Sequence, residues 1–311
     1  MTDQNESLYD MTEMEDGVDG IEIEETTSEL DIPFDLEESQ LPEDMSEERS
    51  DDCIVLDKEK FDVFLNVLGI IRKNCKDVSI KGGQLCQSSN GRNVLYNADL
   101  TELIGDIDLN LSGLDSKCDL FDIFRKQQSE EVYVEIEPKI YKIGDTISSI
   151  LINKPNEETL NNKNRSTDNP FNEEDISKNL TKVFDVKIGQ LILNRFGSLK
   201  KSMASDNIIL DFTQKGCILS LKQNDKNCGV VVNVHKITDI KQPIIGKTII
   251  NIDCFLHSYG DVNFELYADE KTTEDGTMKC RYKISFKVGP KPEIQITIWG
   301  AAKIITNDDL E

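Results

Sequence analysis

The chain has 311 residues, which is enough for two ordinary domains, and a formal net charge of −24 at pH 7. Residues 1–56 hold 21 of the 59 acidic residues and one of the 35 basic residues, a net of −20, so the remainder is close to balanced at −4. We expect no secretory signal, because the first residues carry acids where such a signal carries bases, and the longest apolar-rich run, 63–71, is too short to cross a membrane.

The first 56 residues have too few apolar side chains to bury a core, and their like charges repel one another. We therefore expect residues 1–56 to form a disordered acidic tail. Eight cysteines are scattered along the chain without a Cys-x-x-Cys pair, which is typical of reduced thiols in the cytosol and gives no metal-ligand spacing. We expect a cytoplasmic protein, in the cytoplasm of the host cell if the chain is viral.

The first folded element expected is a helix over residues 58–76. At 100° per residue its apolar side chains fall on one side, namely Phe61, Phe64, Leu65, Leu68, Ile71 and Cys75. The opposite side carries three bases and one acid, namely Lys58, Lys73, Lys76 and Asp62. The pattern predicts a basic exposed stripe in a protein that is acidic overall.

Residues 79–96 are typical of a hairpin followed by a further strand, with Gly82 and Gly83 at the turn. A second helix is expected over 114–127, where three aspartates offset the bases Lys117, Arg125 and Lys126. An alternating strand follows at 132–137. These elements together predict a first domain at 57–152.

Residues 153–174 are polar, rich in asparagine and bracketed by Pro155 and Pro170, which is the composition of a linker. A second domain is predicted at 175–305, and a short C-terminal tail at 306–311.

The second domain runs through the same order of elements as the first, which indicates two copies of one fold. Its first helix region carries Lys187, Arg195, Lys200 and Lys201 with no acid after Asp185, although Arg195 falls near the apolar stripe. Its last helix, expected near 252–259, has no base. Strands of period-two alternation complete it. The fold class expected is α+β, with two similar domains, each an antiparallel sheet with two helices on one face.

No catalytic constellation is evident in the sequence. The two histidines, His235 and His257, lie on an expected strand and an expected helix, and no phosphate-binding loop, dinucleotide fingerprint or nucleophile motif is present. We therefore expect no enzymatic activity, no cofactor and no metal site.

Several segments resemble the T4-type bacteriophage DNA polymerase sliding clamps. In the first domain these are Ile80–Leu85, Val94–Leu100, Ile107–Leu109 and Leu114, followed by Lys139–Ile150, which is similar to that family's closing hairpin. In the second domain, Leu191–Leu199 resembles the family's inner helix, and Gln295–Trp299 resembles its last strand. The resemblance covers about residues 57–305 in element order, although clamps have no short diagnostic motif.

The resemblance implies a ring of six similar domains, with helices lining the hole and sheets forming the rim, so that two domains per chain give a homotrimer. It implies a processivity factor that holds duplex DNA without reading its sequence and that works with a DNA polymerase and a clamp loader. DNA-binding residues would be the ten bases Lys58, Lys73, Lys76, Lys117, Arg125, Lys126, Lys187, Arg195, Lys200 and Lys201. Subunits would meet where Ile147 and Ile150 of one copy pair with Val230 and Val232 of the next.

Two other functions stay open on the residues alone. A clamp-like structural or transcription-accessory protein without DNA encirclement is compatible with the aspartates of the helix expected over 114–127 and with the missing bases of the helix expected near 252–259. A single-strand DNA-binding protein would need exposed aromatic side chains, and aromatic residues make up only 6% of the chain. The acidic tail is expected to fold over a basic surface, to offer residues 32–36 to a partner, or only to keep the chain in solution.

Overall fold

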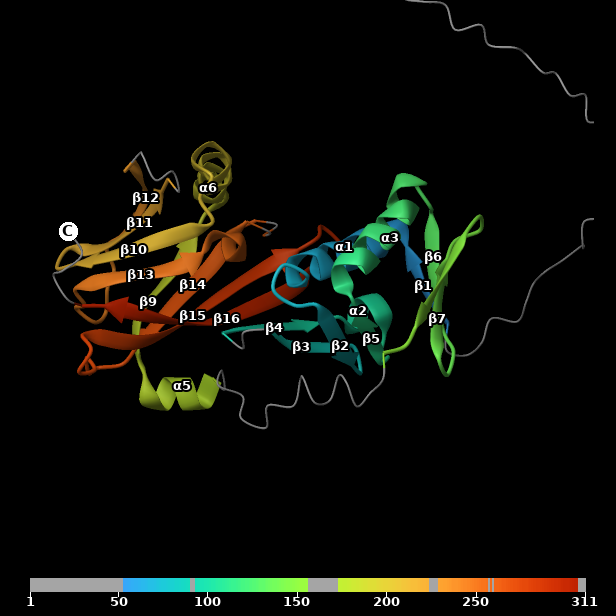
Figure 1. Ribbon diagram of the computed structural model, residues 1–311, viewed down its shortest axis with the longest axis horizontal. Helices are drawn as coiled ribbons and strands as arrows, with labels where there is room; N and C mark the ends of the chain where they lie inside the picture. Colours follow the sequence, from blue (N-terminus) through green and yellow to red (C-terminus); the bar gives the residue numbers. More distant parts are fainter. Residues whose placement is uncertain are drawn as a thin grey trace, which may run out of the picture. The chain divides into compact units, whose positions relative to one another are not determined.

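A computed structural model describes residues 53–89, 93–155, 173–223, 229–256, 258 and 260–306 (Figure 1). The first half contains β1 Cys53–Asp57, α1 Lys58–Ile71, β2 Asp77–Lys81, β3 Gln84–Ser88, β4 Val94–Asp99, α2 Thr101–Ile104, β5 Leu109–Ser112, α3 Leu114–Lys126, β6 Glu131–Ile136, β7 Ile140–Gly144 and β8 Ser149–Asn153. The second half contains α5 Glu173–Asn179, β9 Thr181–Ile188, α6 Gln190–Met203, β10 Asn207–Thr213, β11 Gly216–Lys222, β12 Val231–Ile237, β13 Gly246–Asn251, the 3₁₀ helix η1 Ile252–Phe255, β14 Val262–Ala268, β15 Thr277–Val288 and β16 Ile294–Ile305.

The two halves repeat one order of elements. β1, α1, four strands, α3 and three further strands are matched by β9, α6, four strands, η1 and three further strands. The short helix α2 interrupts only the first copy. The duplication expected from the sequence is therefore confirmed, and with it the α+β fold of antiparallel sheets and helices.

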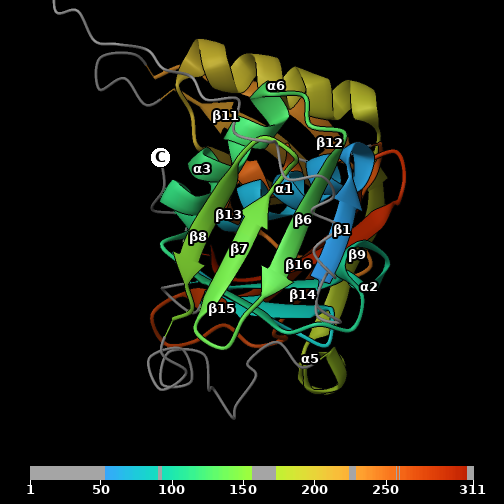
Figure 2. The ribbon, with the colours of Figure 1, turned by 90° about the vertical axis from the view of Figure 1, so that its right-hand side faces the viewer.

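All strand pairs of the described residues are antiparallel, and they form two sheets. One has four strands in the order β1-β6-β7-β8, and these lie side by side in Figure 2. The other has twelve strands and runs through both halves, because β16 of the second half pairs with β4 of the first. The twelve-stranded sheet makes one structural layer across the boundary between the two copies.

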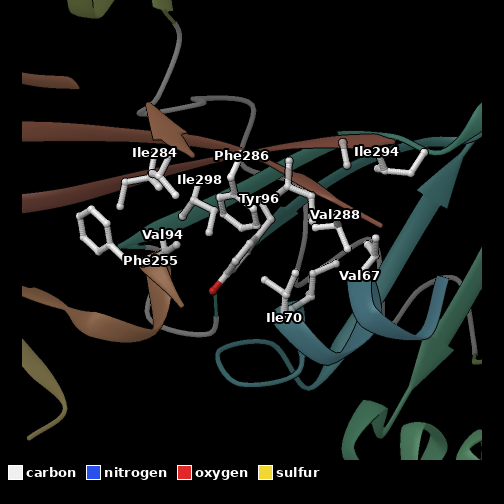
Figure 3. Packing of buried hydrophobic residues seen from close by; sticks show 14 of the residues in the cluster. Val67, Ile70, Val94, Tyr96, Phe255, Ile284, Phe286, Val288, Ile294 and Ile298 are labelled. Carbon is white, nitrogen blue, oxygen red and sulfur yellow. The ribbon is translucent and has the colours of Figure 1, made fainter. Parts of the chain in front are cut away.

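Helix α1 is enclosed on several sides, which corrects the expectation of one apolar face. Val67 and Ile70, outside the predicted apolar stripe, are buried, and Figure 3 shows them beside Phe286 and Val288 of β15 and Ile294 of β16. The helix therefore packs against strands of the second half as well as against β1, β6 and α3. Its burial on two sides ties the two copies together through a shared apolar core.

Helix α5 covers the face of the large sheet that is opposite α6, as Figures 1 and 2 both show. Its Ile176 is buried and belongs to a small apolar cluster with Leu95 of β4, Tyr267 of β14 and Trp299 of β16. Helix α5 therefore packs across strands from both halves, and only its first two residues belong to the predicted linker.

Three expected boundaries differ from the structure. Residues 53–56, assigned to the tail by composition, form β1, because Ile54 and Leu56 alternate inward while the strand pairs with β6. The helix expected over 58–76 ends at Ile71, and the fourth helix expected near 252–259 is only the one-turn η1. Residues 1–52 of the predicted tail, 156–172 of the predicted linker and 307–311 of the C-terminal tail lie outside the described residues.

Candidate nucleic-acid interface

Helices α1, α3 and α6 lie on one side of the large sheet, while α5 lies on the other (Figure 1). The side chain of Asp57 caps the start of α1 by accepting a hydrogen bond from the Lys60 amide at 2.8 Å. Asp261 similarly accepts the amide N–H of Gln190 at the start of α6, at 3.2 Å. The caps fix where each helix begins, and the shared side of the sheet gives the three helices a common outer surface.

Asp253 joins the two halves of this helical surface. Its Oδ1 lies 3.4 Å from the Nζ of Lys73, just after α1, and also accepts a short hydrogen bond from Lys200 of α6. Burial alone would raise the pKa of Asp253, but the hydrogen bond and positive charge of Lys200, together with Lys73, outweigh it and lower the pKa. Asp253 therefore stays ionised and holds two predicted DNA-binding lysines within reach of each other.

The contact between α1 and α3 is held by two arginines. The Nε of Arg125 lies 2.8 Å from the Oδ1 of Asp62, and its second amino group donates to the Asn66 side chain at 3.3 Å. Arg72 donates to Asp119 at 2.9 Å, and this hydrogen bond raises the pKa of Arg72. The positive charges of Arg72 and Arg125 are therefore partly neutralised by the ion pairs that join the two helices.

Two hollows open along the helical surface and meet at Lys73 and Ser258. One, of about 550 Å³, lies between α1 and α3 and is lined by Arg72, Asp119 and Arg125 among others. The other, of about 850 Å³, lies along α6, and its lining includes Lys200, Lys201 and Asp253. The structure thus brings together four of the predicted DNA-binding residues, which are Lys73, Arg125, Lys200 and Lys201.

The other predicted bases line neither hollow, namely Lys58, Lys76, Lys117, Lys126, Lys187 and Arg195. Lys126 pairs with Asp122 at 3.4 Å, and Lys187 pairs with Asp261 at 2.9 Å and thereby lowers the pKa of that carboxyl. Lys73 and Lys76 follow the end of α1 and so are not on the helix as expected. Charge is therefore unevenly distributed over the helical surface.

Helix α6 differs from α1 and α3 because it contains three bases and no acid. Arg195 and Lys201 are exposed and make no ion pair with any residue that the structure describes. Phe196 and Leu193 fill the core side of the helix, so Arg195 sits at the solvent side of the apolar stripe rather than in it. The sequence pattern placed Arg195 near the apolar stripe, and the structure shows that its side chain is exposed to solvent.

Within the described residues the edge strands are β1, β5, β8, β9 and β12, and of these β8 and β12 carry the most exposed apolar side chains. β8 is the edge of the four-stranded sheet, with Leu151 64% exposed, and Ile147 just before it is 81% exposed. β12 is an edge of the large sheet, with Val231 51% exposed. The predicted interface residues Ile150 and Val232 are half-buried neighbours of these, and alternation alone could not tell which side of either strand faces outward.

Asp145 shapes the turn that leads into β8. Its carboxylate accepts the amide N–H groups of Ile147 at 2.8 Å and Ser148 at 2.7 Å, and also the hydroxyl of Ser129. Burial alone would raise the pKa of Asp145, but these three hydrogen bonds lower it. An ionised Asp145 therefore holds Ile147 at the edge of the sheet.

Within the described residues no group of three or more His, Cys, Asp or Glu side chains is placed to hold a metal ion. Six of the eight cysteines lie in the described residues without forming a disulfide, and burial raises the pKa of Cys75 to about 12. None of the helices in this part of the chain is both long and apolar enough to cross a bilayer.

No model of a known protein family and no curated protein sequence matches this chain. Solved structures do. The PCNA2–PCNA3 complex of Sulfolobus tokodaii matches with a TM-score of 0.50 at 8% identity, over 80% of this chain and 98% of that chain. The chain has a PCNA-like clamp fold. Proliferating Cellular Nuclear Antigen from Entamoeba histolytica matches with a TM-score of 0.50 at 10% identity and the same coverage. Identities this low carry the fold and no more.

Proposed function

We propose that this chain is a DNA sliding clamp, of which three copies form a ring around duplex DNA and tether a replicative polymerase for processive synthesis. The observation that carries the proposal is the pair of unpaired sheet edges at β8 and β12, in a chain with the clamp fold. Exposed, unpaired edges with apolar side chains invite strand addition unless another chain covers them.

Two different edges on one chain favour a head-to-tail assembly. If β8 of one copy pairs with β12 of the next, every copy uses one edge of each kind, and the assembly closes when the rotation between copies matches a ring. Leu151 and Ile147 on one side and Val231 and Val230 on the other supply apolar surface to bury at each joint. Six similar domains, two per chain, then require three chains.

The helical surface suits contact with phosphates and not with bases. Arg195, Lys200 and Lys201 of α6 and Lys73 beside them provide positive charge without a recognition element for sequence. Many weak phosphate contacts permit sliding, and their strength falls as salt rises. None of the large apolar side chains exposed in the described residues is aromatic, which disfavours stacking on single-stranded bases.

A partner surface is available on the opposite face of the second half. Ile249 of β13 is 58% exposed, Ile245 just before it is 55% exposed, and Ile305 at the end of β16 is 40% exposed. The register of β13 and β16 puts these three side chains on one face, away from α6. We assign this patch to an apolar peptide of the polymerase or of the clamp loader, with no catalytic role for the chain itself.

One observation favours the second candidate, a clamp-like accessory protein without DNA encirclement. Acids within the same surface pair with five of the ten predicted DNA-binding bases, which are Lys73, Arg125, Lys126, Lys187 and Lys200. A surface neutralised in this way binds DNA weakly, and the ring would then serve protein partners alone.

Native mass spectrometry combined with duplex binding tests the proposal. We expect a species of three times the 35.2 kDa chain mass. At any one salt concentration, we expect duplexes of unrelated sequence to bind with the same affinity. A chain that stays monomeric at micromolar concentrations would overturn the ring. A trimer that binds no duplex at low salt would favour the accessory protein.

A further inference from the structure

The outward face of α6 is a helix face without a partner among the described residues. Leu191 is 86% exposed, the highest value among the exposed large apolar side chains of the described residues. Arg195 and Lys201 lie on the same helix, exposed and without an ion pair in the described part of the chain. Arg195 lies one turn from Leu191, and Lys201 lies about 15 Å farther along the helix than Leu191. An apolar side chain and two unpaired cations spread along one helix face fit an extended acidic segment that also carries apolar residues.

The chain itself contains such a segment. Residues 1–52 hold 21 acids and one base, Arg49, whereas residues 53–311 are close to neutral. The segment also contains the apolar run 32–36, Ile-Pro-Phe-Asp-Leu. Charge complementarity therefore points to residues 1–52 as the occupant of the α6 face.

The attachment point allows the contact within one chain. The segment joins the fold at Cys53, where β1 begins, and β1 leads directly into α1. A chain of 52 residues extends to roughly 170 Å, and as a flexible coil it has an end-to-end distance of about 40 Å. A tethered segment of this length reaches an effective concentration on the order of 1 mM, which is enough to populate a weak electrostatic contact.

We propose that residues 1–52 bind the outward face of α6 through Arg195, Lys201 and Leu191. The contact is electrostatic in the main, so it weakens as salt rises. Its consequence rests on the proposed function: DNA must displace the acidic segment before its phosphates reach α6. The contact itself does not depend on DNA.

Lysine acetylation read out by mass spectrometry on the intact chain tests the contact. Lys201 should react about 3- to 10-fold more slowly at 20 mM salt than at 500 mM salt, because the bound segment shields it. The matched control is Lys279, which is exposed on the other face of the large sheet and should change by less than about twofold.

Two variants identify the occupant. Shielding of Lys201 should vanish in a chain that begins at residue 48, which keeps the whole of the compact unit 48–311. It should also vanish in a full-length chain whose acids in 1–47 are replaced by their amides. Shielding that survives both changes, or that grows with protein concentration because a second copy occupies the face, would overturn the proposal.

Duplex binding separates this proposal from the proposed function. If both hold, the chain beginning at residue 48 binds duplex DNA at least about 10-fold more tightly at 50 mM salt, and the difference disappears by 500 mM. Shielding of Lys201 without any duplex binding by either chain would leave the contact standing and refute the clamp. Duplex binding that is equal in the two chains, with Lys201 unshielded, would refute the contact alone.

Discussion

Asp253 limits the positive charge of the helical surface, so its neutralisation should strengthen DNA binding. The carboxylate holds both Lys73 and Lys200 through the same oxygen atom. Asp253→Asn keeps the side-chain shape and leaves both ammonium groups able to turn toward phosphate. Stability and DNA affinity should therefore change in opposite directions.

The expected size follows from the contacts. The Asp253 side chain is 21% exposed, and loss of its charge-assisted hydrogen bonds should lower the free energy of unfolding by about 1–2 kcal/mol. Each ammonium group that gains a phosphate contact steepens the slope of log K against log salt by about 0.9, so binding at 0.1 M salt strengthens roughly 8-fold for one contact and 60-fold for two.

Fluorescence anisotropy with a labelled duplex over a salt series, beside urea denaturation, measures both effects. Asp211→Asn is the matched control, because this substitution removes the same charge as Asp253→Asn. Asp211 pairs with Lys247 at 3.8 Å on the face of the sheet away from α6. If Asp253→Asn leaves the salt slope unchanged, Asp253 does not limit the charge available to phosphates. The same conclusion follows if the control strengthens binding equally, since overall charge would then explain the gain.

Three further results are expected. Leu151→Glu should raise the dissociation constant between subunits by about 10- to 100-fold in sedimentation velocity, because a half-exposed apolar side chain is lost from the joint, while Ile249→Glu should leave assembly unchanged. Arg195→Ala should reduce the salt slope of duplex binding by about 0.9 with no change in melting temperature, and Lys279→Ala should do neither. Asp145 has a lowered pKa, so its carboxylate stabilises the fold above its unfolded pKa near 4 and the gain is lost as pH falls through the folded pKa. Asp145→Asn should therefore cost about 1–3 kcal/mol in denaturation at pH 7 and almost nothing near pH 2, and a cost that is equal at both pH values would contradict this.

The repeated order of elements and the alternating strands could be predicted from the sequence, because both follow from local apolar periodicity. The burial of Val67 and Ile70 could not, since it depends on strands some 220 residues later in the chain that pack on a second side of α1. The spacing of Ile252 and Phe255 suits a 3₁₀ turn as well as an α-helix, and the structure has the shorter element.

For the candidate site, too, the sequence shows local composition but not contacts between distant segments. Lys200 and Lys201 could be proposed as DNA-binding residues because α6 has no acids, which composition reveals directly, and their role stays a prediction. Asp253 was missed because its two lysine partners come from distant segments, and no pattern along the chain marks that meeting. The sequence pattern also did not show that Leu151 is more exposed than Ile150, since alternation gives two sides of a strand without saying which one is outward.

We propose that three chains close around duplex DNA through β8 and β12. The most direct measurement replaces Leu151 with p-benzoylphenylalanine, irradiates the protein on a nicked circular plasmid, and then denatures it in detergent. We expect covalently closed rings that stay on the circle after denaturation and are released when the plasmid is cut once. Cross-linked protein that leaves the circle without cutting, or cross-links that miss β12, would contradict it.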